Sequence, residues 1–110
     1  MRQGEIWFAD LEPAKGSEQA GRRPVVIMSG NTLNEALPIV IVVPITSKIK
    51  SYPTCVLLRK SRANGLKKNG EAIPFQVRTI TKKRLGKRIG RVTNEELRDI
   101  LKGLVAVLTH

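Results

Sequence analysis

The sequence predicts a small, mainly β domain with a C-terminal α-helix, folded as a strongly bent sheet or barrel. Five or six short apolar stretches are separated by turn residues, which is typical of strands. Near the C-terminus, apolar residues recur instead with the spacing of a helix. A length of 110 residues fits one compact domain, so we expect residues 1–110 to form a single unit.

Three strands are expected in the first half of the chain. Residues 5–10 are rich in aromatic and β-branched side chains and predict the first strand. Residues 11–23 contain proline and glycine without an apolar period, so they predict a loop. Residues 24–29 and 38–45 are nearly continuous apolar runs, which are typical of strands buried on both faces.

The second half continues with shorter strand signals. Residues 54–59 predict a fourth strand, and residues 72–80 predict a fifth. Pro74 lies inside the latter segment and indicates an edge strand or a bulge, because proline has no N–H to donate. Residues 88–92 are the candidate for a short last strand.

A helix is expected after Thr93. Thr93 and Glu96 have the spacing of a capping box, in which each residue satisfies a backbone N–H of the other. Six apolar residues then follow on one helical stripe: Leu97, Ile100, Leu101, Leu104, Val105 and Leu108. Ala106 and Val107 lie off this stripe, which leaves open whether another subunit covers a second face.

The charge of the chain points to an anionic partner. Twenty Lys and Arg residues stand against nine Asp and Glu, which gives a net charge of +11. The densest segment is 59–91, where twelve residues are basic and Glu71 is the only acid. Phosphate backbones relieve such self-repulsion by releasing counterions, and an acidic protein would relieve it as well. A solvated lysine-rich surface is the plain alternative.

The scarcity of cysteine and histidine restricts the chemistry. Cys55 and His110 are the single residues of their types, so one chain cannot form a disulfide, a Cys/His zinc site or a histidine acid–base pair. We therefore expect no metal and no cofactor. No apolar run reaches the roughly 20 residues of a membrane span, and the first residues carry no apolar signal core. We expect a cytoplasmic protein without a membrane partner.

Six motifs lie along nearly the whole chain: residues 4–10 (GEIWFAD), 16–29 (GSEQAGRRPVVIMS), 43–47 (VPITS), 52–53 (YP), 76–80 (QVRTI) and 84–85 (RL). Together they strongly resemble the MazF/PemK family of toxin endoribonucleases. The resemblance implies an SH3-like barrel with appended helices and a homodimer. It also implies a type II toxin, neutralised by an acidic antitoxin, that cleaves single-stranded RNA at short sequences without a metal. The implied products are a 2′,3′-cyclic phosphate and a 5′-hydroxyl.

The resemblance places the catalytic residues at Arg23, Thr46 and Glu18. A fixed guanidinium at Arg23 suits the negative charge that builds on phosphate during attack by the ribose 2′-oxygen. A hydroxyl at Thr46 can donate to a phosphoryl oxygen. Arginine stays protonated and is a poor general base, so the group that takes the 2′-proton is open. Glu18 is one candidate, and its alternative role is to hold the loop by a hydrogen bond.

Further residues are expected to bind RNA. They are Gln19, Arg22, Ser47, Gln76, Arg78, Lys82, Lys83 and Arg84. For those after residue 75, the alternative is that they only keep an edge of the protein solvated. One departure concerns Phe75, which stands where several members of the family carry an aspartate that is assigned acid–base work in PemK-type members. Phenylalanine cannot transfer a proton, so that mechanism is in doubt here. We expect Phe75 in the core, with base stacking as the alternative.

Two other functions are compatible with a small basic barrel. One is a gyrase poison of the related CcdB type, which relies on a tryptophan near the C-terminus. This chain ends in Leu108, Thr109 and His110, and that difference argues against the CcdB reading. The other is a non-catalytic SH3-like barrel that binds RNA without cutting it.

Overall fold

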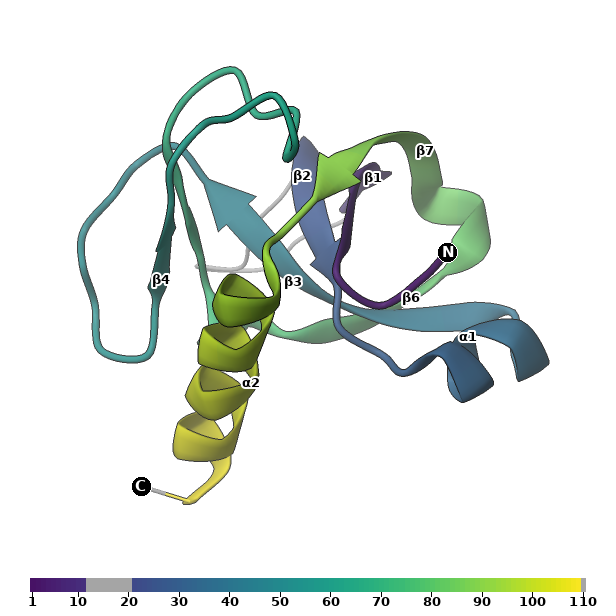
Figure 1. Cartoon of the computed structure of the whole chain (residues 1–110). Helices are drawn as coiled ribbons and strands as arrows, with labels where there is room; N and C mark the ends of the chain where they lie inside the picture. The colour runs from purple at the N-terminus through teal and green to yellow at the C-terminus, as the bar shows by residue number, and fades with distance from the viewer. Residues whose placement is uncertain (12–20, 110) are drawn as a thin grey trace.

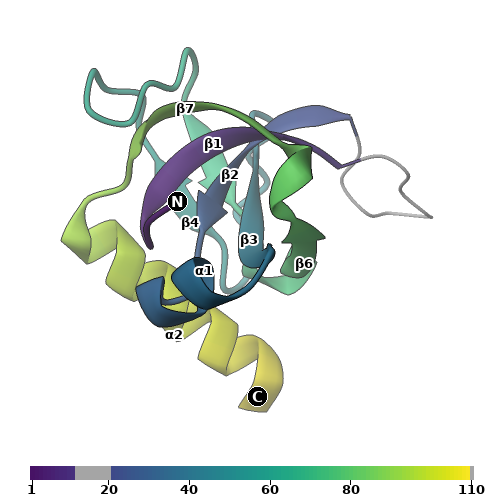
Figure 2. The same ribbon diagram turned by 90° about the vertical axis from the view of Figure 1, so that its right-hand side faces the viewer.

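A curved antiparallel sheet with a helix packed below it makes up the fold (Figures 1 and 2). The computed structural model describes residues 1–11 and 21–109. The strands are β1 (Glu5–Asp10), β2 (Arg22–Ile27), β3 (Ile39–Thr46), β4 (Val56–Leu58), β5 (Gly70–Ala72), β6 (Arg78–Thr81) and β7 (Leu85–Arg91). The helices are α1 (Asn31–Ala36) and α2 (Asn94–Thr109), with 3-10 turns η1 (Pro74–Gln76) and η2 (Lys82–Arg84). The predicted class, a mainly β, SH3-like small barrel with a C-terminal helix, is confirmed.

Strand β3 organises the sheet. The strand order is β4-β5-β3-β2-β1-β7, and β6 pairs with β3 beside this path. One edge of β3 pairs with β2, whereas β6 and β5 share the other edge: β6 pairs with residues 39–42 and β5 with residues 45–46. In Figure 2, β1 and β7 arch over the sheet, which gives it its strong curvature.

Both faces of β2 and β3 are buried, as their continuous apolar sequences predict. Successive side chains of a strand point to opposite faces. Val26 and Val43 therefore join one apolar cluster with Ile100 of α2, whereas Val25 and Val42 join a second cluster.

The expected strand 72–80 is wrong as a continuous strand. The chain forms β5, turns through η1 and resumes as β6. Pro74 begins the turn, where its missing N–H costs nothing, and its carbonyl accepts a hydrogen bond from the N–H of Val77. The break allows one segment to pair with both ends of β3.

Three other boundaries differ from the expectation. Strand β2 begins at Arg22 rather than at Pro24, and β4 is shorter than residues 54–59. Strand β7 begins at Leu85, three residues before the expected start, because its pairing with β1 is made by a segment of Gly, Lys and Arg with little apolar signal. Helix α1 was not predicted, and its six residues carry no side-chain cap.

The capping box of α2 is confirmed. The hydroxyl Oγ1 of Thr93 accepts a hydrogen bond from the N–H of Glu96 at 3.0 Å, and the N–H of Thr93 donates to Glu96 Oε1 at 2.8 Å. The predicted stripe is only partly buried. Ile100 is fully buried, and Leu97 and Leu104 pack against the same cluster. The other three members of the stripe are exposed on this chain: Leu101, Val105 and Leu108.

Candidate active site

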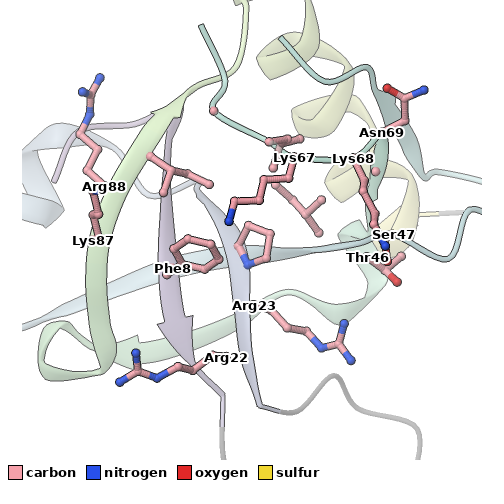
Figure 3. A pocket seen from close by; sticks show the side chains of 16 residues that line it. Phe8, Arg22, Arg23, Thr46, Ser47, Lys67, Lys68, Asn69, Lys87 and Arg88 are labelled. Atoms are coloured by element: carbon pink, nitrogen blue, oxygen red, sulfur yellow. The ribbon is translucent and has the colours of Figure 1, made fainter. Parts of the chain in front are cut away.

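A basic cavity of about 570 Å³ opens where β2 begins and β3 ends (Figure 3). That volume is typical of small-molecule sites. Its polar lining comes from β2, from the end of β3, from the segment between β4 and β5, and from β7: Arg22, Arg23, Thr46, Ser47, Lys67, Lys68, Asn69, Lys87 and Arg88. We call it the cationic cavity.

Arg23 and Thr46 line this one cavity although 22 positions separate them. Arg23 lies opposite Ala9 of β1, at the end of β2 that follows the 12–20 segment. Because side chains alternate along a strand, Arg22 points the other way, and Figure 3 shows the two guanidinium groups diverging. Of the predicted catalytic residues, the structure therefore brings Arg23 and Thr46 together. Glu18 lies outside the described residues.

Thr46 is held tightly at the end of β3. Its side chain is almost fully buried, and its Oγ1 accepts a hydrogen bond from the N–H of Lys48 at 3.1 Å. That hydrogen bond occupies one lone pair of Thr46 Oγ1, so the hydroxyl proton points away from the N–H of Lys48. Thr46 lies opposite Glu71 of β5. The neighbouring Gly70 permits this close pairing, since a Cβ there would stand 2.8 Å from Ile45 Cγ2.

Four cations of the cationic cavity were not among the predicted site residues: Lys67 and Lys68, and also Lys87 and Arg88. Figure 3 shows Lys67 reaching into the cavity towards Arg23's strand, and Lys68 running towards Thr46 and Ser47. The sequence offered one signal, the basic segment 59–91. Charge density alone did not distinguish these four residues from the other basic residues of that segment.

Arg88 at the cavity wall is already paired. Its Nε lies 2.9 Å from Glu5 Oε2, and Glu5 is mostly buried. Burial raises the pKa of Glu5, but the N–H groups of Arg2 and Trp7 and the charge of Arg88 outweigh it and lower the pKa below 4.5. Trp7 packs against the second apolar cluster.

A second cavity, of about 460 Å³, adjoins the first at Thr46. Its other lining residues come from the segment between β3 and β4, from β5 and from η1: Lys48, Lys50, Tyr52, Cys55, Glu71, Ile73, Phe75 and Gln76. We call it the aromatic cavity. The expected core position of Phe75 is wrong, because this side chain is 45% exposed. The turn at Pro74 directs Phe75 away from the sheet.

Cys55 is half-buried in the aromatic cavity rather than in either apolar cluster. Burial, together with the nearby charge of Glu71, raises the pKa of the Cys55 thiol to about 11. The thiol is therefore protonated at neutral pH and is a poor nucleophile or metal ligand there.

The structure does not bring the predicted RNA-binding residues together at one place. Ser47 and Gln76 line the cationic and the aromatic cavity, respectively. Arg22 also lines a third cavity of about 300 Å³, at the ends of β1 and β2, together with Lys83 and Arg84. Gln19 lies outside the described residues.

Arg78 and Lys82 make structural hydrogen bonds. Arg78 Nη1 donates to the carbonyl oxygen of Leu11 at 3.2 Å, and Lys82 Nζ donates to the carbonyl oxygen of Asn34. Arg84 Nη1 similarly donates to the carbonyl oxygen of Asp10 at 3.3 Å. The structure does not bring Arg78 or Lys82 into the two cavities at Thr46.

Solved structures with the same fold are toxins and their complexes. The chain matches MazF from Deinococcus radiodurans with a TM-score of 0.88 at 22% identity, covering 100% of this chain and 97% of the other. It matches an endoribonuclease in complex with its cognate antitoxin, from a mycobacterial species, with a TM-score of 0.82 at 26% identity. That match covers 98% of this chain and 94% of the other. The fold and its basic cavity thus define a small toxin of the MazF class.

Sequence comparison assigns the family. The model of the PemK-like, MazF-like toxins of type II toxin–antitoxin systems matches residues 2–108, and the chain belongs to this family. It is 37% identical to Endoribonuclease MazF of Staphylococcus saprophyticus over 100% of this chain and 98% of the relative. It is 43% identical to Endoribonuclease MazF9 of Mycobacterium tuberculosis over 88% of this chain and 86% of the relative. Among the described residues, no helix is long and apolar enough to cross a membrane.

Proposed function

We propose that this chain is the toxin of a type II toxin–antitoxin system and arrests growth as a sequence-selective endoribonuclease on single-stranded RNA. One observation carries the proposal: Arg23 and Thr46 line one basic cavity in a member of a family whose relatives are named endoribonucleases. The cavity gathers cations where a phosphodiester would bind. Arginine forks match phosphate oxygens, and lysines add charge.

The chemistry proposed is attack of a ribose 2′-oxygen on the neighbouring phosphorus. The new O2′–P bond forms as the P–O5′ bond breaks, which leaves a 2′,3′-cyclic phosphate and a 5′-hydroxyl. The 2′-hydroxyl gives up its proton, and the departing 5′-oxygen gains one. The Arg23 guanidinium stabilises the charge that builds on the phosphoryl oxygens. The Thr46 hydroxyl accepts a hydrogen bond from the N–H of Lys48 and donates a hydrogen bond to one of these phosphoryl oxygens.

A cleavage assay in excess chelator tests this function. We expect a long RNA to be cut at defined sites, with 5′-hydroxyl ends, in the absence of any added metal. RNA that is bound but stays intact would identify a non-catalytic binding module instead. Indifference to RNA would support the gyrase-poison alternative. Loss of cleavage on chelation would overturn the metal-independent mechanism.

We also propose a homodimer that is neutralised by an acidic antitoxin. The exposed apolar side chains of α2, Leu101, Val105 and Leu108, are a surface that association would cover. The net charge of +11 favours an acidic partner, and a mycobacterial relative is solved with its antitoxin. Because the proposed substrate is cellular RNA, we assign the action to the cytoplasm. Sedimentation at micromolar concentration should give twice the chain mass of 12.2 kDa, and a monomer alone would overturn the dimer.

A further inference from the structure

The aromatic cavity holds an unusual pair of side chains. Tyr52 is 50% exposed and Phe75 is 45% exposed, so each keeps a large apolar ring in water. Their ring centroids lie 6.2 Å apart at 57°, within the range of a tilted aromatic pair. Lys50 Nζ lies 5.9 Å from the centroid of the Tyr52 ring, close enough for a cation–π contact.

The backbone holds Tyr52 in place from one side. The Glu71 carboxylate is buried and accepts hydrogen bonds from the N–H groups of Lys50 at 3.3 Å and Ser51 at 2.9 Å. Ser51 has a φ of 54°, in the left-handed region that a serine adopts only when its surroundings hold it there. The carbonyl of Tyr52 then accepts from the N–H of Cys55 at 3.1 Å, which closes the turn.

Phe75 is held from the other side. The η1 turn that carries it packs on α2 at Gly103, where a Cβ would stand 2.8 Å from Pro74 Cγ. Two turn hydrogen bonds of 3.0 Å, from Gln76 N–H to Ile73 and from Val77 N–H to Pro74, fix the backbone around the ring. Hydrogen bonds thus fix the backbone beside both rings, Tyr52 in the connection between β3 and β4 and Phe75 in η1.

We infer that Tyr52 and Phe75 form a stacking platform for one nucleobase of the RNA, next to the phosphate bound at Arg23 and Thr46. This inference rests on the proposed function. Thr46 lines both cavities, so an RNA strand that places a phosphate on one side of it places the adjoining nucleotide on the other. Lys48 and Lys50 also line the aromatic cavity, and their positive charges can bind the next phosphate of the strand. Every base offers a π-face, and stacking on an aromatic residue is worth about 1–3 kcal/mol.

An acidic antitoxin segment is the competing occupant. The observations favour RNA because the platform is continuous with the cationic cavity through Thr46, and because Lys48 and Lys50 line the same cavity as the rings and can bind a nucleotide's phosphate. The exposed ring of Phe75 can bind a base by stacking, whereas it cannot transfer a proton.

The test uses an RNA that contains a sequence cleaved by the wild-type protein, with a 2′-methoxy group at the scissile ribose to block cutting. 2-Aminopurine replaces one base at a time on either side of that position. We expect wild-type protein to quench its fluorescence at one position by twofold or more, because the base stacks on a ring. Phe75→Trp should retain the quench. Phe75→Leu and Tyr52→Leu should lose it and weaken binding about fivefold or more.

Leu37→Ala is the matched control. Leu37 is 44% exposed and precedes β3, at the opposite end of the strand from Thr46. Its substitution should leave the quench unchanged. A quench that is absent at every position, or equally strong in Phe75→Leu and Tyr52→Leu, would overturn the platform. Cleavage by the wild-type protein together with that result would leave the endoribonuclease standing and remove only the platform. A wild-type protein that neither cuts nor binds RNA would remove both.

Discussion

The two cavities that meet at Thr46 differ in what lines them. On one side lie Arg23, Lys67 and Lys68, and on the other lie Tyr52 and Phe75. The cationic cavity has the chemistry of phosphate binding, which is independent of sequence and sensitive to salt. The aromatic cavity adds two exposed rings on which a base can stack, beside Lys48 and Lys50. One buried threonine, Thr46, lies between the two cavities, and in the proposed complex it separates the reacting phosphate from the base beside it.

The largest expected effect is on the reaction rate, in the cationic cavity. Arg23→Ala should lower the cleavage rate by about 10²–10³-fold while changing RNA affinity much less, because its interaction is strongest in the transition state. Arg23→Lys should recover little, since an ammonium lacks the planar two-point contact. Single-turnover cleavage and filter binding give the two quantities.

Two variants control this prediction. Arg22→Ala removes the guanidinium that points the other way and should cost mainly affinity. Thr46→Val keeps the shape of the side chain and removes the hydroxyl, so a loss of rate there isolates the hydrogen bond. Equal rate losses at Arg22 and Arg23, or full activity in Thr46→Val, would show that the site is placed wrongly.

The next effect concerns the support of the aromatic cavity. Glu71→Gln replaces one of two acceptor oxygens by a donor, which leaves the N–H of Lys50 or Ser51 without its acceptor. A buried unsatisfied group costs about 1–3 kcal/mol, so the free energy of unfolding should fall by that amount in urea titrations. Glu35→Gln, on the surface at 3.9 Å from Arg2, should change it negligibly. Equal stability of Glu71→Gln and the wild-type protein would contradict the role of Glu71.

The salt dependence of RNA binding distinguishes the lysines of the cationic cavity from the ring of Phe75. We expect the slope of log affinity against log salt to be steeper than about −2 for the wild-type protein, because several phosphates displace counterions. Lys67→Ala and Lys68→Ala should each reduce that slope by about 1. Phe75→Leu should weaken binding without changing the slope. A slope that responds to Phe75 and ignores both lysines would reverse the assignment of the two cavities.

The smallest effect tests the wall of the cationic cavity. The lowered pKa of Glu5 means that its carboxylate stabilises the fold above the unfolded value of about 4.5 and loses this contribution as the pH falls through the folded value. Glu5→Gln should lower stability at pH 7 by about 1 kcal/mol or less. The difference from the wild-type protein should shrink below pH 4.5. A difference that grows on acidification would contradict the ion pair with Arg88.

The sequence predicts best where local pattern and tertiary burial agree. The apolar runs of β2 and β3 are continuous because each face packs into its own cluster. The capping box at Thr93 was predicted because it depends only on two residues that are three positions apart in the sequence. Strand β7 pairs with β1, and this pairing could not be predicted because the Gly, Lys and Arg residues of β7 give only a weak strand signal in the sequence.

Less of the candidate site than of the fold could be predicted from the sequence. Arg23 and Thr46 were found through motifs, whereas Lys67 and Lys68 reach the same cavity through a long connection between β4 and β5 that carries no local signal. The prediction for Phe75 failed because an apolar residue within a strand-like run favours the core. The turn at Pro74 and its packing on Gly103 reverse that outcome, and both depend on tertiary structure.

The most direct test of the division between the cavities is to map 5′-hydroxyl ends after limited cleavage of a random RNA pool by the wild-type protein, Lys67→Ala and Phe75→Leu. We expect Lys67→Ala to cut less while keeping the wild-type base frequencies around the cut. Phe75→Leu should change those frequencies at one position beside the cut, because bases differ in the strength with which they stack on a ring. Unchanged frequencies in Phe75→Leu, or altered frequencies in Lys67→Ala, would contradict the account.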